Sequence, residues 1–404
     1  MKRILCLMLT LCFVLAVGCA PAQPSSPAAP AAPAAPGAPE APASSKVIPD
    51  EIKLGLMSTI SGGQAIDGKN MTDAITLVSE ELEALGGLDV DGKKVKISWV
   101  IEDTEAKPEI AVNAVQKLIE QDKVLAIVGP NNSGETIASG EISQAAKVPQ
   151  ITNTGTNIKV TQVGDYIFRA CIIDPFQGIV VAKFAYDNLK ITKAAILYDN
   201  ADTYSSGLSE SFKNAYEALG GTIVANEAYS GQDVKDFSAQ LTIIKNANPE
   251  AIFYPSHIEN IPLQLQQTRG MGITATLLGC DSWDYAALPD LVGRDVLEGA
   301  YYVTGFSPDA DSAKDFVKKF NDRFGYRPSF CSAMAYEAAH IVLNAIQRAE
   351  TIDGPGVRDA MAATDMDLPS GHVKFDEFRN PVKSGTVLQV RDGVAQYVTS
   401  IEPD

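Results

Sequence analysis

Histidine and basic residues are scarce in this sequence, and both shortages exclude classes of function. The 404 residues include 3 His, and 33 Lys and Arg stand against 50 Asp and Glu, which gives a formal net charge of −17. Proteins that bind nucleic acid through its phosphates need the opposite sign of charge. An acidic surface also repels anionic lipid head groups. We therefore expect no nucleic-acid partner and no membrane attachment through a basic patch.

Motifs of common enzyme active sites are absent as well. The sequence has no GxSxG nucleophile elbow, no GxxxxGK[ST] phosphate loop, no HExxH and no CxxC. Its histidines, His257, His340 and His372, lie far apart. Residues 270–275 match the dinucleotide pattern GxGxxA, but they follow an expected helix and lead into an expected strand, so we interpret them as a helix C-terminus. Neither an enzyme nor a cofactor is expected.

The first 19 residues have the pattern of a secretion signal. Lys2 and Arg3 precede an apolar run over residues 4–17, which is shorter than the roughly 20 residues that span a bilayer. Small residues lead into Cys19, and this stretch resembles the lipobox of bacterial lipoproteins, a family in which the cysteine is acylated and becomes the first mature residue. We expect residues 1–18 to be removed and Cys19 to anchor an extracytoplasmic protein to a bacterial membrane, on its periplasmic side or at the cell surface. An ordinary secretion signal is the alternative.

A proline-rich segment follows Cys19. From residue 24 to residue 42, proline recurs at every third position, which is the period of a polyproline II helix. At about 3.1 Å per residue such a segment reaches roughly 80 Å. Residues 19–49 are therefore expected to be a lipidated tether and not a folded domain.

Three cysteines remain for the folded body. Cys171, Cys280 and Cys331 have no zinc-like spacing and no histidine near them in sequence, so no metal site is expected. An odd number of cysteines leaves at most one disulfide. The spacing does not decide which pair forms.

From residue 50 onward, short β-branched runs alternate with helical patterns. The expected strands are residues 51–57, 94–101, 124–128, 150–153, 166–171, 193–198, 222–229, 251–254, 276–278, 299–304, 373–375, 386–391 and 395–399. The expected helices are residues 68–85, 108–121, 135–146, 176–189, 205–219, 237–247, 258–269, 310–324, 332–349 and 356–363. The alternation predicts an α/β protein with parallel sheets covered on both faces. Because so many strands exceed the usual size of one sheet, we expect two doubly wound lobes.

Polar residues follow several of these strands, at the edge where open α/β sheets bind ligands. Ser133 begins a helix after one strand, and Thr154 and Thr156 follow the next strand. Hydroxyls and backbone N–H groups at a helix start can hold a carboxylate. Such residues are also common caps, so each of them alone has a purely structural alternative.

The second half of the chain offers the complementary groups. Tyr204 follows a strand, and Asp281 follows the strand over residues 276–278, with Trp283 two residues later. A carboxylate that faces hydroxyls between aromatic walls suits a zwitterionic amino acid, with Asp281 binding the ammonium and Ser133 and Thr156 binding the carboxylate. The alternative for the two aromatic residues is that they only cover the core.

At these same positions the chain resembles the type I periplasmic binding proteins, specifically the Leu/Ile/Val-binding branch that serves branched-chain amino acid ABC transporters. The resemblance spans residues 52–399, and its matching positions are residues 52–55, 61–62, 102–103, 108, 111, 129–130, 133, 151–152, 154–156, 168–169, 174, 177–178, 199, 204, 236–237 and 375–376. It implies that Ser133, Thr154 and Thr156 contact the carboxylate and amine, that Tyr204 is an aromatic wall, and that Asp281 pairs with the ammonium.

The chain departs from this resemblance at three positions near the expected ligand. His257 and Asp67 stand where the family often has tyrosine, and Cys331 stands where it has phenylalanine. These departures count against leucine, isoleucine and valine as ligands. An amino acid or a related small carboxylate remains the expected ligand. The alternatives are a receptor for short amides, urea or aromatic acids, or a sensor that passes its state to a signalling partner.

The resemblance also implies two lobes that close on the ligand and a permease of the ABC type as partner. Lobe one is expected over residues 50–171 and 306–376, and lobe two over residues 172–305 and 377–404. Three strands should cross between them near residues 169–173, 303–306 and 375–383. A further hypothesis is that Cys280 and Cys331 line the second-lobe side of the cleft and pair as a disulfide.

Overall fold

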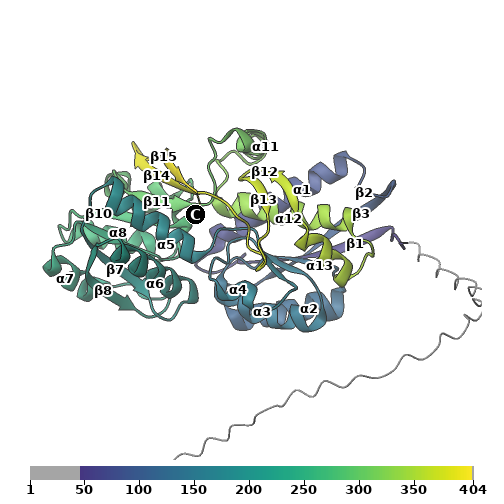
Figure 1. Ribbon diagram of the computed structural model, residues 1–404, viewed down its shortest axis with the longest axis horizontal. Helices are drawn as coiled ribbons and strands as arrows, with labels where there is room; N and C mark the ends of the chain where they lie inside the picture. Colours follow the sequence, from purple (N-terminus) through teal and green to yellow (C-terminus); the bar gives the residue numbers. More distant parts are fainter. Residues whose placement is uncertain (1–45, 403–404) are drawn as a thin grey trace, which may run out of the picture. The chain divides into compact units, whose positions relative to one another are not determined.

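Two main β-sheets organise residues 46–402, the part of the chain that the computed structural model describes (Figure 1). One sheet has the strand order β2-β3-β1-β4-β5-β6, and the other has the order β15-β14-β11-β10-β9-β7-β8. This arrangement confirms the prediction of two α/β lobes. The signal segment, Cys19 and the proline-rich tether up to residue 45 lie outside the described residues, so those expectations remain predictions.

The six-stranded sheet is built from the first part of the chain. Its strands are β1 (Glu51–Ser58), β2 (Leu88–Val90), β3 (Lys93–Asp103), β4 (Ile127–Val128), β5 (Gln150–Thr152) and β6 (Ile167–Arg169). The helices α1 (Ala65–Ala84), α2 (Pro108–Lys117), α3 (Ser133–Ala146) and α4 (Lys159–Gln162) alternate with them. All neighbouring strands run parallel except β2, which forms an antiparallel pair with β3. β1 is central, because Gly55 lies opposite both Val100 and Ile127.

The seven-stranded sheet combines the middle of the chain with its end. Its strands are β7 (Lys193–Asp199), β8 (Thr222–Tyr229), β9 (Ala251–Phe253), β10 (Thr276–Gly279), β11 (Tyr301–Thr304), β14 (Gly385–Arg391) and β15 (Val394–Ile401). The accompanying helices are α5 (Asp174–Lys183), α6 (Thr203–Ala218), α7 (Ser238–Ala247), α8 (Ile261–Gly270), α9 (Leu288–Val292) and α10 (Arg294–Leu297). In Figure 1, α5 to α8 surround the teal and green strands of this sheet.

The last two strands differ from the parallel pairing expected of the lobes. β14 pairs antiparallel with β11 and with β15. Only Asp392 and Gly393 separate β14 from β15, and both have positive φ (53° and 73°). A two-residue turn of this kind closes a hairpin, whereas a parallel connection needs a dozen or more residues.

After β11 three long helices follow one another without an intervening strand, as predicted. A short turn η4 (Asp311–Ala313) leads into α11 (Lys314–Phe324), α12 (Phe330–Arg348) and α13 (Gly354–Ala362). α12 packs against α1, β2, β4 and β5, so the chain has returned to the six-stranded sheet. Most residues of α12 are buried, as expected of a helix that is covered on several sides. A small hairpin of β12 (Asp365–Leu368) and β13 (Gly371–Lys374) comes next.

The three connections between the sheets lie side by side. The first connection lies between β6 and α5, the second follows β11, and the third lies between β13 and β14. A Cβ added to Gly305 of the second connection would lie 3.3 Å from Ile172 of the first. Lys383 of the third connection donates to the carbonyl of Ala170 of the first at 2.7 Å. The same ammonium pairs with Glu337 of α12 at 2.5 Å, and the two side chains are 2% and 0% exposed. A buried ion pair therefore ties two of the connections to α12.

One further expectation has a clear outcome. Residues 270–275 hold the last residue of α8, the turn at Gly272 with φ of +73° and the approach to β10, which confirms a helix C-terminus. Within residues 46–402, no helix is long and apolar enough to cross a membrane.

Candidate functional site

A small cavity lies where the carboxyl ends of strands from both sheets meet. Its lining residues are Asp67, Asn131, Asn132, Ser133, Thr154, Tyr204, His257, Asp281, Ser282, Tyr285, Phe330 and Cys331. Apart from the last two, which begin α12, these residues follow β1, β4, β5, β7, β9 or β10. The cavity volume is about 30 Å³, which is room for about one or two water molecules. The two sheets are therefore closed upon this site.

Five of the seven sequence-predicted site residues line this cavity: Ser133, Thr154, Tyr204, His257 and Asp281. Hydrogen bonds fix the loops that carry the first two. The N–H of Asn157 donates to Ser133 Oγ at 3.1 Å, and Thr154 Oγ1 donates to the carbonyl of Asn131 at 3.0 Å. The loops after β4 and β5 are thus held against each other, with both hydroxyl-bearing residues on one side of the cavity.

The loop after β4 comes close to β1 because residue 129 is glycine. Gly129 has φ of +92°, and a Cβ at this position would lie 2.1 Å from the carbonyl oxygen of Met57. No other residue fits a position with this backbone angle and this contact. The glycine therefore allows Ser133, four residues later, to begin α3 at the edge of the cavity.

Thr156 and Trp283 do not line the cavity. Thr156 is fully buried, and its carbonyl accepts the N–H of Asp174 at 2.9 Å. Trp283 packs beside Gly279 and Tyr254 and faces a separate cavity. Asp281–Trp283 forms a 3₁₀ turn, and with three residues per turn the side chains at its two ends point in different directions.

Asp281 is held at the cavity by two hydrogen bonds. The hydroxyl of Tyr204 donates to its carboxylate at 2.5 Å, and its own N–H donates to the side-chain oxygen of Gln177 at 2.8 Å. Asp281 is 5% exposed, and burial raises the pKa of its carboxyl above the ordinary value even though Tyr204 opposes that shift. A cation placed beside this group would relieve the burial penalty.

Asp67 brings a second carboxylate from the opposite side. It lies in the first turn of α1 and accepts a hydrogen bond from the hydroxyl of Tyr285, which follows β10. It too is 5% exposed, and burial raises the pKa of its carboxyl to about 7. The family resemblance identifies Asp67 as a departure from a tyrosine position and implies no role for it.

His257 is a cation at neutral pH. Burial alone would lower its pKa, but the Asp202 carboxylate, 3.4 Å from its Nε2, outweighs burial together with Glu259 and Asp67 and raises that pKa to about 10. Its ring also packs on Tyr204, with centroids 4.8 Å apart. The positive charge of His257 is thus already matched by Asp202.

The hypothesis of a Cys280–Cys331 disulfide is wrong for this structure. Cys171, Cys280 and Cys331 are all buried free thiols. Cys280 Sγ lies 3.0 Å from the Tyr204 hydroxyl, whereas Cys331 Sγ contacts Asn153 at 3.4 Å. Cys331 belongs to α12, which packs on the six-stranded sheet, so the two thiols come from different sides of the cleft.

Several lining residues were missed from the sequence. Asn131 and Asn132 stand directly before Ser133 in the same loop after β4, so the strand-end argument applies to them as well. Tyr285 lies six residues beyond the end of β10, where that argument is weaker. Phe330 follows no strand, so the strand-end argument carried no signal for it.

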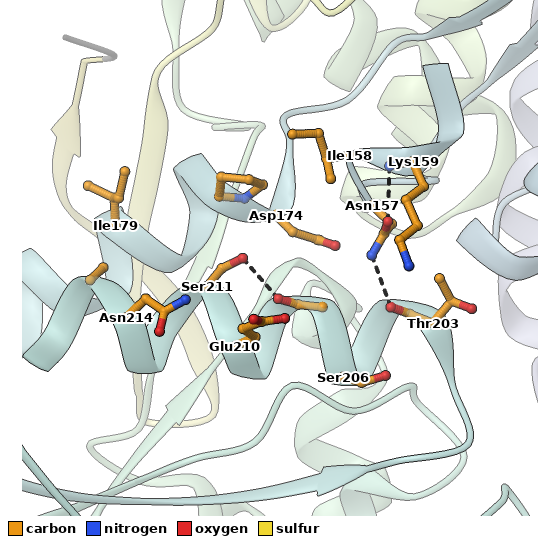
Figure 2. A pocket seen from close by; sticks show the side chains of 13 residues that line it. Asn157, Ile158, Lys159, Asp174, Ile179, Thr203, Ser206, Glu210, Ser211 and Asn214 are labelled. Carbon is orange, nitrogen blue, oxygen red and sulfur yellow. Dashed lines mark hydrogen bonds between the residues drawn. The ribbon is translucent and has the colours of Figure 1, made fainter. Parts of the chain in front are cut away.

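A second, larger cavity of about 590 Å³ lies between α5 and α6 (Figure 2). Asn157 spans it by donating from Nδ2 to the carbonyl of Thr203 at 3.0 Å. Its charged lining residues are Lys159 and Glu210, which are exposed, and Asp174, which is a single buried carboxylate. None of the seven sequence-predicted site residues lines it. The smaller cavity, with convergent buried charges, is the stronger candidate for the functional site.

Two α/β lobes with a polar site between the carboxyl ends of their strands define a solute-binding protein of the type I periplasmic class. A family model described as "Periplasmic binding protein" matches residues 51–395. The chain belongs to this family.

Relatives and solved structures agree. An "Amino acid binding protein" of Pseudomonas aeruginosa is 28% identical over 319 residues, covering 78% of this chain and 82% of that protein. The "Leu/Ile/Val-binding protein homolog 7" of Brucella abortus is 26% identical, covering 88% and 92%. The crystal structure of a leucine binding protein from Thermotoga maritima has a TM-score of 0.81 at 31% identity, covering 87% of this chain and 99% of that one. A solute binding protein from Rhodopseudomonas palustris in complex with 3,4-dihydroxybenzoic acid has a TM-score of 0.79 at 26% identity, covering 88% and 98%.

Proposed function

We propose that the protein is the extracytoplasmic substrate-binding component of an ABC importer and that it binds an amino acid or a related small carboxylate between its lobes. The observation that carries this proposal is the placement of Asp281 opposite Ser133. One side of the cavity holds a buried carboxylate, and the other holds a hydroxyl at the start of a 14-residue helix. A zwitterion matches both sides, and the relatives named as amino-acid binding proteins support this choice.

Each group has a defined role in the proposal. Asp281 binds the ammonium, Tyr204 positions that carboxylate and forms a wall, and Ser133 and Thr154 bind the ligand carboxylate together with N–H groups at the start of α3. His257 forms another wall beside Tyr204. The contacts first expected of Thr156 and Trp283 are not part of the proposal, since both side chains are buried outside the cavity.

Binding would require the lobes to part and close again. A cavity of about 30 Å³ is too small for any amino acid, so the ligand must enter an open form. We assign residues 50–171 and 306–376 to lobe one and residues 172–305 and 377–404 to lobe two, with the three connections as the hinge. Contacts made by the ligand to both lobes favour the closed form, which the permease would recognise. Acylated Cys19 and the tether would hold the protein at the membrane.

An aromatic acid is the second candidate, because one similar structure was solved in complex with 3,4-dihydroxybenzoic acid. Such a ligand supplies a carboxylate but no ammonium. Asp281 would then remain buried without a cationic partner, which is costly. The amino acid is therefore the better match.

A ligand panel tests the proposal. The protein is titrated by calorimetry with the common amino acids, short amides, urea and benzoates. We expect at least one amino acid to bind with micromolar or tighter affinity, and benzoates and amides to bind at least about 100-fold more weakly. Tight binding of a benzoate with no response to any amino acid would overturn the proposal.

A further inference from the structure

The cavity carries more negative charge than a simple zwitterionic ligand would balance. Two carboxylates, Asp67 and Asp281, line it from opposite lobes. Of the described residues that line the cavity, none is Lys or Arg, and His257 is the single cationic group. That imidazolium forms its ion pair with Asp202 at 3.4 Å, and Glu259 and Asp67 act on it less strongly, so neither cavity carboxylate has it as an ion-pair partner.

A simple amino acid would satisfy only one of these carboxylates. Its single ammonium pairs with Asp281 under the proposed function, and its carboxylate is bound by the groups around Ser133. Asp67 would then stay in the closed cavity with the hydroxyl of Tyr285 as its donor. Ionising a carboxylate that is 5% exposed and has one neutral donor carries a large desolvation penalty, and for this reason burial raises the pKa of Asp67 to about 7.

The position of Asp67 indicates what relieves this penalty. It lies on α1 of the six-stranded lobe, whereas Asp281 lies beyond β10 of the seven-stranded lobe. A ligand whose α-ammonium reaches Asp281 directs its side chain away from that group. Asp67 is thus a second anionic contact on the other wall of the same cavity.

We propose, building on the proposed function, that the ligand carries a second cationic group. The ligand is then a basic amino acid such as lysine, ornithine or arginine. Its α-ammonium pairs with Asp281, and its side-chain cation pairs with Asp67. A charged group held by a buried carboxylate discriminates strongly, because an analogue that lacks the charge leaves that carboxylate unpaired. The aliphatic amino acids would therefore be poor ligands.

Matched ligand pairs test this proposal on the full protein by calorimetry. Lysine is compared with norleucine, and arginine with citrulline, because each pair has similar size and differs in the side-chain charge. We expect the charged member of at least one pair to bind about 30-fold or more tightly than its neutral partner, which corresponds to about 2 kcal/mol.

The Asp67→Asn variant isolates the proposed contact, with Asp309→Asn on the exposed surface as the matched control. We expect the charged-to-neutral preference to fall below about 3-fold in Asp67→Asn and to stay unchanged in Asp309→Asn. If Asp67→Asn does not fold, the ligand ratios of the unsubstituted protein decide the matter.

The outcomes separate this inference from the proposed function. Binding of norleucine or leucine as tightly as lysine and arginine would overturn the second cationic contact and leave an amino-acid receptor in place. A preference for the charged ligands that Asp67→Asn retains would also overturn the assignment to Asp67. Failure of every amino acid to bind, together with tight binding of a benzoate, would overturn the proposed function itself.

Discussion

The hydroxyl of Tyr285 donates a hydrogen bond to the carboxylate of Asp67, and this bond crosses from one lobe to the other. Gln64 makes a second crossing by donating to Glu259 at 2.9 Å. The closed arrangement is therefore stabilised by the protein's own groups as well as by any ligand. A bound ligand that pairs with Asp67 would have to replace or share the contact from Tyr285.

Removing that contact should shift the protein toward the open form. In Tyr285→Phe the buried carboxylate of Asp67 loses its donor, and an unsatisfied buried group of this kind costs about 1–3 kcal/mol, more if it is charged. We expect a larger radius of gyration for the ligand-free variant in small-angle X-ray scattering. Tyr397→Phe, on the exposed face of β15, is the control. An unchanged radius in Tyr285→Phe would show that this bond does not hold the lobes together.

The buried pair of Lys383 and Glu337 should be essential for stability. Lys383→Met leaves Glu337 buried without its cation, and breaking such a pair by removing one partner costs about 3–5 kcal/mol. Urea denaturation measures this loss. Replacing both residues by apolar ones should recover most of it, although Glu337 also accepts two bonds from Ser370. A loss below about 1 kcal/mol in the single variant would contradict the role given to this pair.

Stability should fall as pH rises from about 5 to 8. Burial raises the pKa of Asp67 and of Asp174 to about 7 and that of Glu135 to about 8, so the folded state holds protons that the unfolded chain has released. The pKa of His257, which burial lowers and Asp202 raises to a net value of about 10, acts with the same sign above its unfolded value of 6.5. The stability that these groups supply is complete below their unfolded pKa values and is lost as pH passes the folded ones.

Thermal unfolding of the ligand-free protein at pH 5 and pH 8 checks this sign. We expect a higher Tm at pH 5, and a smaller difference between the two pH values in Glu135→Gln. The pKa of Glu81, which burial raises but His340 and Lys319 lower to a net value of about 2, affects stability only below the pH range tested. A higher Tm at pH 8 in the unsubstituted protein would contradict the burial argument.

Much of the architecture follows from the sequence because periodicity and turn residues are local signals. The alternation of strands and helices predicts both lobes, whereas the return of the chain to the first lobe after residue 306 was implied by the family resemblance. The hairpin strands β2 and β12 were missed, since each is short and contains Asp, a residue that is depleted in strands. A short strand is stabilised by its partner, and its own sequence carries little signal.

In the candidate site, too, local sequence signals locate some residues, and only the folded structure brings the others together. Ser133, Thr154, Tyr204 and Asp281 follow strands, so strand ends locate them in sequence. The contact of Tyr285 with Asp67 joins residues 218 positions apart, and only the closure of the two lobes brings them together. Trp283 was predicted to face the ligand because it neighbours Asp281, and the 3₁₀ turn sends it elsewhere.

The most direct test of the account is the affinity of Asp281→Asn for the amino acid that binds the unsubstituted protein most tightly. The substitution keeps the shape of the side chain and removes the charge that is proposed to pair with the ammonium. By calorimetry, with Asp309→Asn as control, we expect at least about a 100-fold loss of affinity in Asp281→Asn and none in the control. An unchanged affinity in Asp281→Asn would contradict the central claim that this buried carboxylate recognises the ligand.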